Sequence, residues 1–322
     1  MKVARYVGGG RIEIQDCAEP ECPPGGLVVQ ASASGLCSGE LMDWYLDQKS
    51  NPILGHEVCG TILESQDNRF PVGQPVFVHH HAPCLQCEMC FRRAYVHCRQ
   101  WQSTRLVPGG MAERFALSRE NLTDSFLIPE LRDVDAALIE PLGCVAKSIQ
   151  RARLCPGDRV AVIGLGSLGL AHALVVQKLG YEVIGYELRP DRRQWAQDRG
   201  IDARAPEQGE RAEVIFVCPG HESALRFALE GAAPAARVVL FAPLPPGQPV
   251  AMDWCQLYFQ DLEIVASYSC GPEDTREAAG WLRDGWRAAD DLVSDFVALD
   301  ELPEAYQKMK RGDLLKAMVQ FT

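Results

Sequence analysis

The sequence has little that would suit a membrane. Its longest apolar stretch, Val160–Val176, is interrupted by three glycines and by His172. That pattern predicts a buried strand, a turn and a helix rather than a membrane span. Residues 1–14 alternate apolar and polar side chains and lack the continuous apolar core of a signal peptide. We therefore expect a cytoplasmic protein with no membrane partner.

Basic residues are also outnumbered by acidic residues. Lys and Arg number 32 against 43 Asp and Glu, which gives a net charge of −11, and the basic residues are not gathered into one run. This balance argues against nucleic acid as a partner. Internal repeats and low-complexity tracts are absent too. With 322 residues, 47% of them hydrophobic, the chain has the composition of an ordinary globular protein with room for two domains.

Cysteine, by contrast, is abundant, with 13 residues. A disulfide framework suits small secreted domains, and this chain fits neither description. Four of the cysteines follow the pattern Cys-x2-Cys-x2-Cys-x7-Cys at Cys84, Cys87, Cys90 and Cys98. Four thiolates at this spacing can enclose one tetrahedral Zn²⁺ with no open position, which predicts a structural zinc site. Iron–sulfur carriers also contain cysteine clusters, and the adjacent His97 is a less favoured substitute ligand.

Two kinds of pattern divide the chain near residue 137. Short β-like runs between turn residues fill 1–136, which predicts an irregular, barrel-like β domain. Strands and helices alternate over 137–269, which predicts a doubly wound parallel sheet. The tail, 270–322, is expected to return to the first domain. The strands predicted in the alternating part are Arg159–Ile163, Glu182–Tyr186, Val214–Val217, Val238–Phe241 and Glu263–Ser267.

A glycine-rich loop joins the first of these strands to a predicted helix at Leu168–Leu179. Its sequence is G-x-G-x-x-G, and its candidate cofactor-binding residues are Gly164, Gly166, Ser167, Leu168 and Gly169. The first glycine permits a tight turn, the second lets the backbone approach a pyrophosphate, and the third lets the helix pack closely. The positive end of the helix then faces the phosphates.

The end of the second predicted strand bears on which dinucleotide is bound. Glu187 stands there, and its carboxylate can bind both ribose hydroxyls and repel a 2′-phosphate. This favours NAD(H) over NADP(H). The nearby Arg192 could instead accept such a phosphate, so NADP(H) stays open.

A third constellation consists of Cys37, His56, Glu57 and Glu140. They stand in the segments Gly-Leu-Cys-Ser-Gly, Gly-His-Glu and Glu-Pro-Leu-Gly. The chain carries Gly-Leu-Cys, Gly-His-Glu, the cysteine cluster, Glu-Pro-Leu-Gly and the glycine-rich loop in that order. With these motifs it resembles the zinc-containing medium-chain dehydrogenase superfamily. The threonine and sorbitol dehydrogenase branches are the most similar.

The resemblance implies a two-domain α/β fold. A GroES-like β-barrel catalytic domain would comprise 1–136 and 270–322, with a structural zinc lobe at about 79–100. A Rossmann domain would comprise 137–269. It also implies a homodimer or homotetramer.

The resemblance further implies two Zn²⁺ per chain, one structural and one catalytic. Cys37 and His56 would ligate the catalytic zinc, and Glu140 or Glu57 would complete the protein ligands. Such a zinc lowers the pKa of the bound alcohol, and hydride passes to the nicotinamide.

Two residues bear on the proton path and the substrate. Relatives carry Ser or Thr two residues after the first zinc cysteine as a proton relay. Here that position is Gly39, so either the neighbouring Ser38 or water and another residue would carry the proton. His81, three residues before Cys84, matches a histidine of threonine dehydrogenases and favours a threonine-like substrate.

The predicted function is therefore NAD(H)-linked, zinc-dependent oxidation of a small secondary alcohol, polyol or hydroxy-amino acid. Two alternatives remain. One is a zinc-free, quinone-type reductase of the same superfamily, which would not need Cys37, His56 or the cysteine cluster. The other is a non-catalytic zinc- and NAD-binding protein that senses redox state.

Overall fold

The structure is a computed structural model that describes residues 1–207 and 209–321. Its internal contacts divide the chain into two compact units. Unit 1 comprises Met1–Gly143 and Cys270–Thr322, and unit 2 comprises Cys144–Ser269. The first boundary falls after Gly143, within the helix α5 (Ile139–Ala152).

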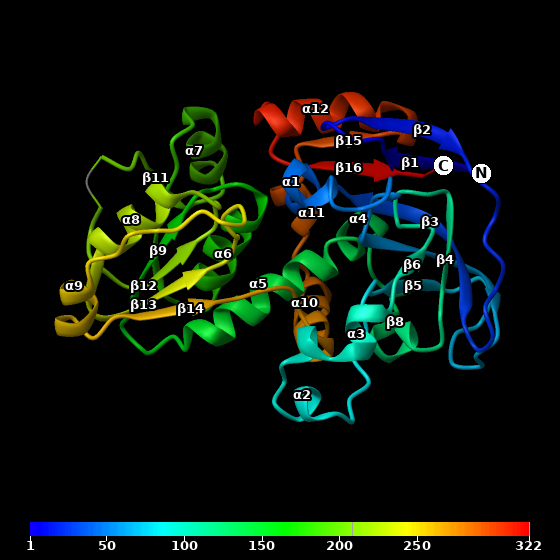
Figure 1. The fold of residues 1–322 in the computed structure, drawn as a ribbon, viewed down its shortest axis with the longest axis horizontal. Helices are drawn as coiled ribbons and strands as arrows, with labels where there is room; N and C mark the ends of the chain where they lie inside the picture. Colours follow the sequence, from blue (N-terminus) through cyan, green and yellow to red (C-terminus); the bar gives the residue numbers. More distant parts are fainter. Residues whose placement is uncertain (208, 322) are drawn as a thin grey trace. The chain divides into compact units, whose positions relative to one another are not determined.

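Unit 1 is built on an eight-stranded, mostly antiparallel sheet with the order β15-β16-β3-β4-β5-β8, in which β7 pairs with β3 and β6 (Figure 1). A separate antiparallel pair is formed by β1 and β2. The strands of this unit are β1 (Lys2–Tyr6), β2 (Ile12–Asp16), β3 (Leu27–Gly35), β4 (Glu57–Ser65), β5 (Pro75–Val78), β6 (Leu106–Val107), β7 (Arg114–Leu117), β8 (Ser125–Leu127), β15 (Asp295–Val297) and β16 (Ala317–Gln320). Because β16 pairs with β3, the C-terminal segment belongs to the same sheet as the N-terminal strands.

Short helices complete unit 1. The longer helix α12 shows how the sequence determines where such a helix packs and ends. Its buried residues Leu302, Ala305, Tyr306 and Met309 follow helical spacing. Gly312, in a left-handed conformation, ends the helix. The helices of this unit are η1 (Ser38–Leu41), α1 (Asp43–Leu46), α2 (Glu88–Phe91), η2 (Tyr95–His97), α3 (Arg99–Ser103), η3 (Asn121–Asp124), α4 (Asp133–Ala136), α10 (Pro272–Arg283), α11 (Ala288–Leu292), η4 (Leu299–Glu301) and α12 (Leu302–Arg311).

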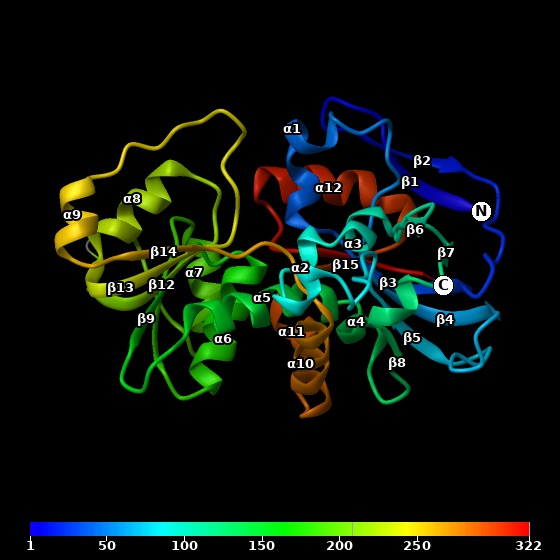
Figure 2. The same ribbon diagram turned by 60° about the horizontal axis from the view of Figure 1, so that its bottom comes forward.

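Unit 2 contains a six-stranded parallel sheet with the order β11-β10-β9-β12-β13-β14. Chain order reverses at β9, as in a doubly wound dinucleotide-binding sheet. Figure 2 shows α8 on one face of this sheet and α6 on the other. The elements are β9 (Arg159–Ile163), α6 (Ser167–Lys178), β10 (Glu182–Tyr186), α7 (Pro190–Gln197), β11 (Asp202–Arg204), β12 (Ala212–Val217), α8 (Glu222–Glu230), β13 (Ala232–Leu240), α9 (Trp254–Phe259) and β14 (Glu263–Ala266). The predicted fold class, an antiparallel β domain with a doubly wound parallel sheet, is confirmed.

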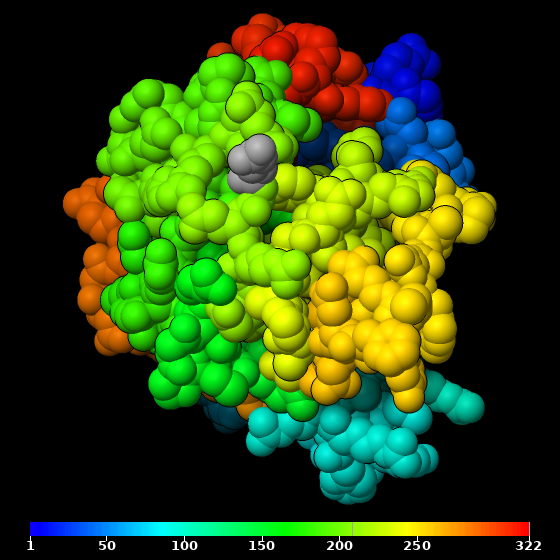
Figure 3. All heavy atoms as spheres, turned by 90° about the vertical axis from the view of Figure 1, so that its left-hand side faces the viewer, coloured from blue at the N-terminus to red at the C-terminus, as the bar shows by residue number. Residues whose placement is uncertain are grey.

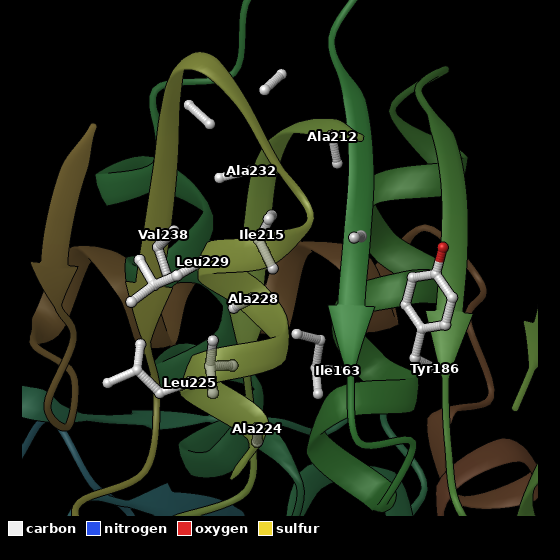
Figure 4. Close-up of a cluster of buried hydrophobic side chains, with 14 of the residues drawn as sticks. Ile163, Tyr186, Ala212, Ile215, Ala224, Leu225, Ala228, Leu229, Ala232 and Val238 are labelled. Atoms are coloured by element: carbon white, nitrogen blue, oxygen red, sulfur yellow. The ribbon is translucent and has the colours of Figure 1, made fainter. Parts of the chain in front are cut away.

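The core of unit 2 forms where α8 packs on the sheet. Leu225 and Leu229 on one side of α8 face Ile215 of β12 and Val238 of β13 (Figure 4). Burying each of these side chains contributes about 2 kcal/mol. Among the described residues, no helix is long and apolar enough to cross a membrane. The expected cytoplasmic location stays a prediction.

A fully buried histidine, His172, lies within α6. Its Nδ1 donates to the Leu168 carbonyl at 2.6 Å, and its Nε2 pairs with the Ser148 hydroxyl. Burial lowers the pKa of His172 to about 4, although the bond to Leu168 opposes this shift. The imidazole is therefore held neutral against the rings of Phe216 and Phe241.

This histidine should make unit 2 less stable in acid. The pKa of His172 is about 4 in the folded chain and near 6.5 in an unfolded chain. Between these values the unfolded state binds more protons, so stability falls as pH is lowered through that window, by up to about 3 kcal/mol. We expect His172→Gln to flatten the pH dependence between pH 4 and 7, measured as the free energy of unfolding in urea. Equal slopes for the two proteins would contradict this.

Candidate active site

Cys37, His56 and Glu57 meet because β3 and β4 are antiparallel neighbours. Cys37 lies just beyond the end of β3, and His56 and Glu57 lie at the start of β4, where Glu57 pairs in register with Gly35. One potential ligand atom from each of the three side chains lies within 4.8 Å of the others. A Cβ on Gly35 would lie 2.2 Å from Glu57 Oε2, so a larger residue at this position would displace the carboxylate.

Two residues that the sequence did not single out support this cluster. Lys316, almost completely buried, donates from Nζ to Glu57 Oε2 at 2.5 Å and to the Leu36 carbonyl at 3.2 Å. Glu40, also buried, accepts from the Gly55 N–H at 2.7 Å and lies 3.3 Å from His56 Nδ1. Each side chain therefore fixes one member of the cluster.

The charges around the cluster suit a cation. Burial raises the pKa of the Cys37 thiol, although His56 opposes the shift. Burial disfavours the His56 cation, yet Cys37 and Glu40 raise the pKa of His56 well above its usual range. Glu57 Oε1 is buried and has no hydrogen-bond partner among residues 1–207 and 209–321. A thiol, an imidazole and an orphaned carboxylate oxygen are the donors that a catalytic zinc uses, so the residues fit such an ion.

Glu140, the other candidate for the third protein ligand, lies at the start of α5. It is the second residue of α5 and is buried, and burial raises its pKa. A ligand atom of Glu140 lies within 4.8 Å of His79 and Cys270, and the charges of His56 and His79 oppose the shift caused by burial.

The two residues considered for proton transfer and substrate choice have different surroundings. Ser38 is exposed at the start of η1. A Cβ on Gly39, in contrast, would lie 3.5 Å from Cys37 Sγ. His81 bonds through Nδ1 to the Thr104 carbonyl at 3.0 Å and stacks on Trp101, and burial lowers its pKa to about 3.

The four clustered cysteines lie in the segment that contains α2, η2 and α3. Cys90 Sγ lies 3.5 Å from Cys87 Sγ and 3.9 Å from Cys84 Sγ, and the group includes Cys98. Bond lengths of about 2.3 Å at a tetrahedral zinc separate the sulfur atoms by roughly 3.8 Å. The geometry therefore fits one closed zinc site, and His97 is exposed outside the group.

The glycine-rich loop of unit 2 has the geometry expected of a phosphate-binding turn. Gly164 has φ +81°, and a Cβ on Gly169 would lie 1.8 Å from the Gly164 carbonyl oxygen, so both positions require glycine. A Cβ on Gly166, in contrast, would meet no atom of the described residues within 4 Å. The helix α6 begins at Ser167, with Leu168 in its first turn. Backbone N–H groups at this helix end can bind a pyrophosphate.

Glu187 lies directly after β10, beside this loop. Its Oε2 accepts from the Leu165 N–H at 2.9 Å, and its Oε1 accepts from the Arg189 N–H at 3.0 Å. Arg192 is half-buried, and its Nε has no hydrogen-bond partner among the described residues. Glu187 and Arg192, the two residues predicted from the sequence to distinguish NAD(H) from NADP(H), thus lie close to the first turn of α7.

Comparison with known proteins supports the resemblance to dehydrogenases. Residues 23–130 match the alcohol dehydrogenase GroES-like domain. The L-galactonate-5-dehydrogenase of Escherichia coli (strain K12) is 25% identical over 316 residues, which cover 91% of each chain. The sorbitol dehydrogenase of Halalkalibacterium halodurans is 25% identical over 336 residues, 97% of this chain and 96% of that protein. Over nearly its whole length the chain is thus similar to dehydrogenases of the alcohol dehydrogenase superfamily.

The predicted class of enzyme, an oxidoreductase of this superfamily, is thereby confirmed. The fold of this dehydrogenase agrees with that of the alcohol dehydrogenase from Thermus sp. ATN1, with a TM-score of 0.89 at 22% identity over the whole of both chains. At that identity the likeness concerns the fold alone.

Glu187 gives a direct test of the dinucleotide site. We expect Glu187→Gln to keep an acceptor oxygen for the backbone but to lose the negative charge. NADP(H) should then bind more tightly relative to NAD(H), by roughly tenfold or more, because a hydrogen bond to a charged group is worth about 1.5–3 kcal/mol. Dissociation constants for both dinucleotides, measured by titration calorimetry, provide the ratio. An unchanged ratio would argue against a ribose-binding role.

Proposed function

We propose that this dehydrogenase oxidises a small secondary alcohol, a polyol or a hydroxy-amino acid with NAD⁺ in a zinc-dependent reaction. The observation that carries the proposal is the cluster of Cys37, His56 and Glu57, with the orphaned Oε1 of Glu57. The polyol and sugar-acid dehydrogenases similar to this chain support the substrate class.

In this proposal each residue of unit 1 has a defined task. A zinc ion held by Cys37, His56 and Glu57 would act as a Lewis acid and lower the pKa of the alcohol. Glu40 holds the orientation of His56 through Nδ1, and Lys316 holds the carboxylate of Glu57. Glu40 and Lys316 would thus fix the orientation of the ligands before a substrate binds. Partners of this kind orient the ligands of a metal and adjust its affinity and reactivity.

In unit 2 the proposed binding residues are those of the loop and the strand end. The N-terminus of α6 would bind the pyrophosphate, and Glu187 would accept hydrogen bonds from the ribose hydroxyls. Since both Glu187 oxygens already accept backbone N–H groups, the carboxylate is held in place in advance.

The expected homodimer or homotetramer is also a proposal. The helix α9 and the residues beside it lie on the surface of unit 2, where Trp254 is 78% and Phe259 79% exposed (Figure 3, yellow to orange). The adjacent β14 is the last strand of the parallel sheet. Exposed aromatic side chains beside an open strand edge are typical of an interface.

The proposed function is tested by NADH formation from a panel of polyols, L-threonine and simple secondary alcohols. We expect turnover on one class, loss of turnover after chelation, and a decrease of roughly 10²-fold or more for Cys37→Ser, because zinc contributes several kcal/mol to such a step. Cys90→Ser serves as a contrast, since it should lower stability through the structural zinc rather than act on the chemistry.

Near-normal rates for Cys37→Ser would overturn the assignment of the catalytic site. If NAD⁺ and zinc bind but no alcohol is oxidised, the non-catalytic redox sensor becomes the better description.

The missing relay hydroxyl leads to a second expectation. Gly39 has room for a side chain whose Cβ would contact Cys37 Sγ at 3.5 Å. We expect Gly39→Ser to fold normally and to raise turnover by up to roughly 10²-fold, the lower end of what a positioned proton acceptor contributes. Gly39→Ala provides the matched control without a hydroxyl. Equal rates for the two variants would show that the proton already has an efficient path.

A further inference from the structure

A row of aromatic side chains begins at His56 of the Cys37 cluster and lies within unit 1. The ring centroids of His56 and His80 lie 4.8 Å apart, and those of His80 and His81 lie 4.1 Å apart. His81 stacks on Trp101, with a centroid distance of 3.9 Å and 29° between the ring planes. Two ring contacts therefore connect the proposed zinc ligand His56 with the stacked pair of His81 and Trp101.

Arg105 lies at the other end of this row. Its Nη1 lies 3.1 Å from His81 Nδ1 and donates to the Thr104 carbonyl at 2.5 Å. The side chain of Arg105 is exposed, and it forms no ion pair with any carboxylate of the described residues. A guanidinium group binds carboxylates and phosphates through two parallel N–H donors. The positive charge of Arg105 is therefore available to an anionic ligand.

The charge of Arg105 acts on the neighbouring imidazoles. Burial lowers the pKa of His81 to about 3, and the charges of His79 and Arg105 lower it further. Burial also lowers the pKa of His80 well below its usual range, and Arg105 adds to this shift after the neighbouring histidines. Both imidazoles are therefore neutral at physiological pH, and the guanidinium group supplies the positive charge at this end of the row.

His80 supplies an unused polar atom next to the cluster. Its Nδ1 is buried and has no hydrogen-bond partner among residues 1–207 and 209–321. The imidazoles on either side are already held, since His56 Nδ1 lies 3.3 Å from Glu40 and His81 Nδ1 bonds to the Thr104 carbonyl. A buried polar atom without a partner is costly and calls for a ligand or water. His80 is thus the imidazole of the row that is suited to bind a hydroxyl group.

These groups together suit an alcohol that also carries an anionic group. A neutral polyol has no group that needs an unpaired guanidinium, whereas a carboxylate or a phosphate does. The chain as a whole has a net charge of −11, which repels anions. A local cation beside the row of rings would offset this repulsion for an anionic substrate. An exposed arginine elsewhere on the surface would bind only water, but Arg105 contacts a row of rings that ends at the proposed zinc ligands.

We propose that Arg105 is a specificity-determining residue that binds the anionic group, a carboxylate or a phosphate, of the alcohol oxidised at the Cys37 cluster. His80 Nδ1 binds another hydroxyl group of the same molecule. This inference rests on the proposed function and narrows its substrate class to hydroxy acids, above all sugar acids, and polyol phosphates. Arg105 has no part in the chemical step.

The first test compares substrates that share a carbon skeleton and differ in charge. Gluconate is paired with sorbitol, galactonate with galactitol, and each polyol with its terminal phosphate ester. We expect the highest kcat/KM for an anionic member, at least tenfold above that of its neutral partner. Preference for the acid or for the phosphate ester identifies which of the two anionic groups Arg105 binds. A neutral polyol that is preferred in every pair would overturn the proposal.

The second test removes the charge with Arg105→Gln. We expect the ratio of kcat/KM for the anionic to the neutral partner to fall roughly tenfold or more, mainly through KM, because hydrogen bonds to a charged group are lost. Arg105→Lys, which keeps the charge without the fork of donors, should restore part of this ratio. Arg11→Gln is the matched control, since Arg11 is exposed, forms no side-chain bond within the part of the chain that the structure describes, and changes the net charge equally. Its ratio should equal that of the wild-type enzyme.

A binding measurement separates this inference from the proposed function. Dissociation constants of gluconate and galactonate for the NAD⁺-saturated protein are measured by titration calorimetry, which needs no turnover. If no alcohol is oxidised, the proposed function fails. Weaker binding of an acid to Arg105→Gln than to Arg11→Gln would still support the anion site. Equal binding to the two variants, or no binding of either acid to the wild-type protein, would overturn it.

Discussion

Lys316 and Glu57 form an ion pair inside unit 1, with 2.5 Å between Nζ and Oε2 and almost no exposure of either side chain. A buried ion pair of this kind loses the hydration of both charges, and removing one partner leaves the other uncompensated, at a cost of about 3–5 kcal/mol. The pair therefore requires that the last strand return to the first sheet. Strand β16 begins one residue after Lys316 and pairs with β3 at Gly35, the residue opposite Glu57. The same pairing that closes the sheet thus places the cation beside the proposed ligand.

Several parts of the structure could be predicted because their causes are local in sequence. The strands Arg159–Ile163 and Glu182–Tyr186 have the predicted bounds, since each is a short apolar run between turn residues. The helix α6 begins one residue earlier than predicted, at Ser167, because the turn after Gly166 already has helical form. Elements that lack an apolar run were not predicted. Strand β11 is one of them, since it has three residues, Asp202–Arg204, of which only the middle one is buried. The helix α9 was also missed, because it has no buried side and its aromatic residues face outward.

The supporting residues of the site depend on contacts between distant segments, which spacing cannot reveal. Lys316 and Glu57 are 259 residues apart, and Cys270 and His79 are 191 apart. A lone lysine at the start of a strand, or a lone cysteine before a helix, is indistinguishable in sequence from a surface charge or a small core residue. Glu40 had a weak signal, since it follows Cys37 by three residues and η1 turns the chain back toward the cluster. The sequence signal for His79 was weaker, because it is the first of three consecutive histidines and its orientation depends on Asp124.

The two glutamates that the sequence left as alternatives share one supporting cation. Glu57 Oε2 accepts from Lys316 Nζ, and Glu57 Oε1 is buried without a hydrogen-bond partner among the described residues. Glu140 lies beside His79 and Cys270, where burial raises its pKa while His56, His79 and Lys316 oppose that shift. The lysine that pairs with Glu57 therefore also favours the charged form of Glu140. The return of the last strand to the first sheet thus supports both carboxylates.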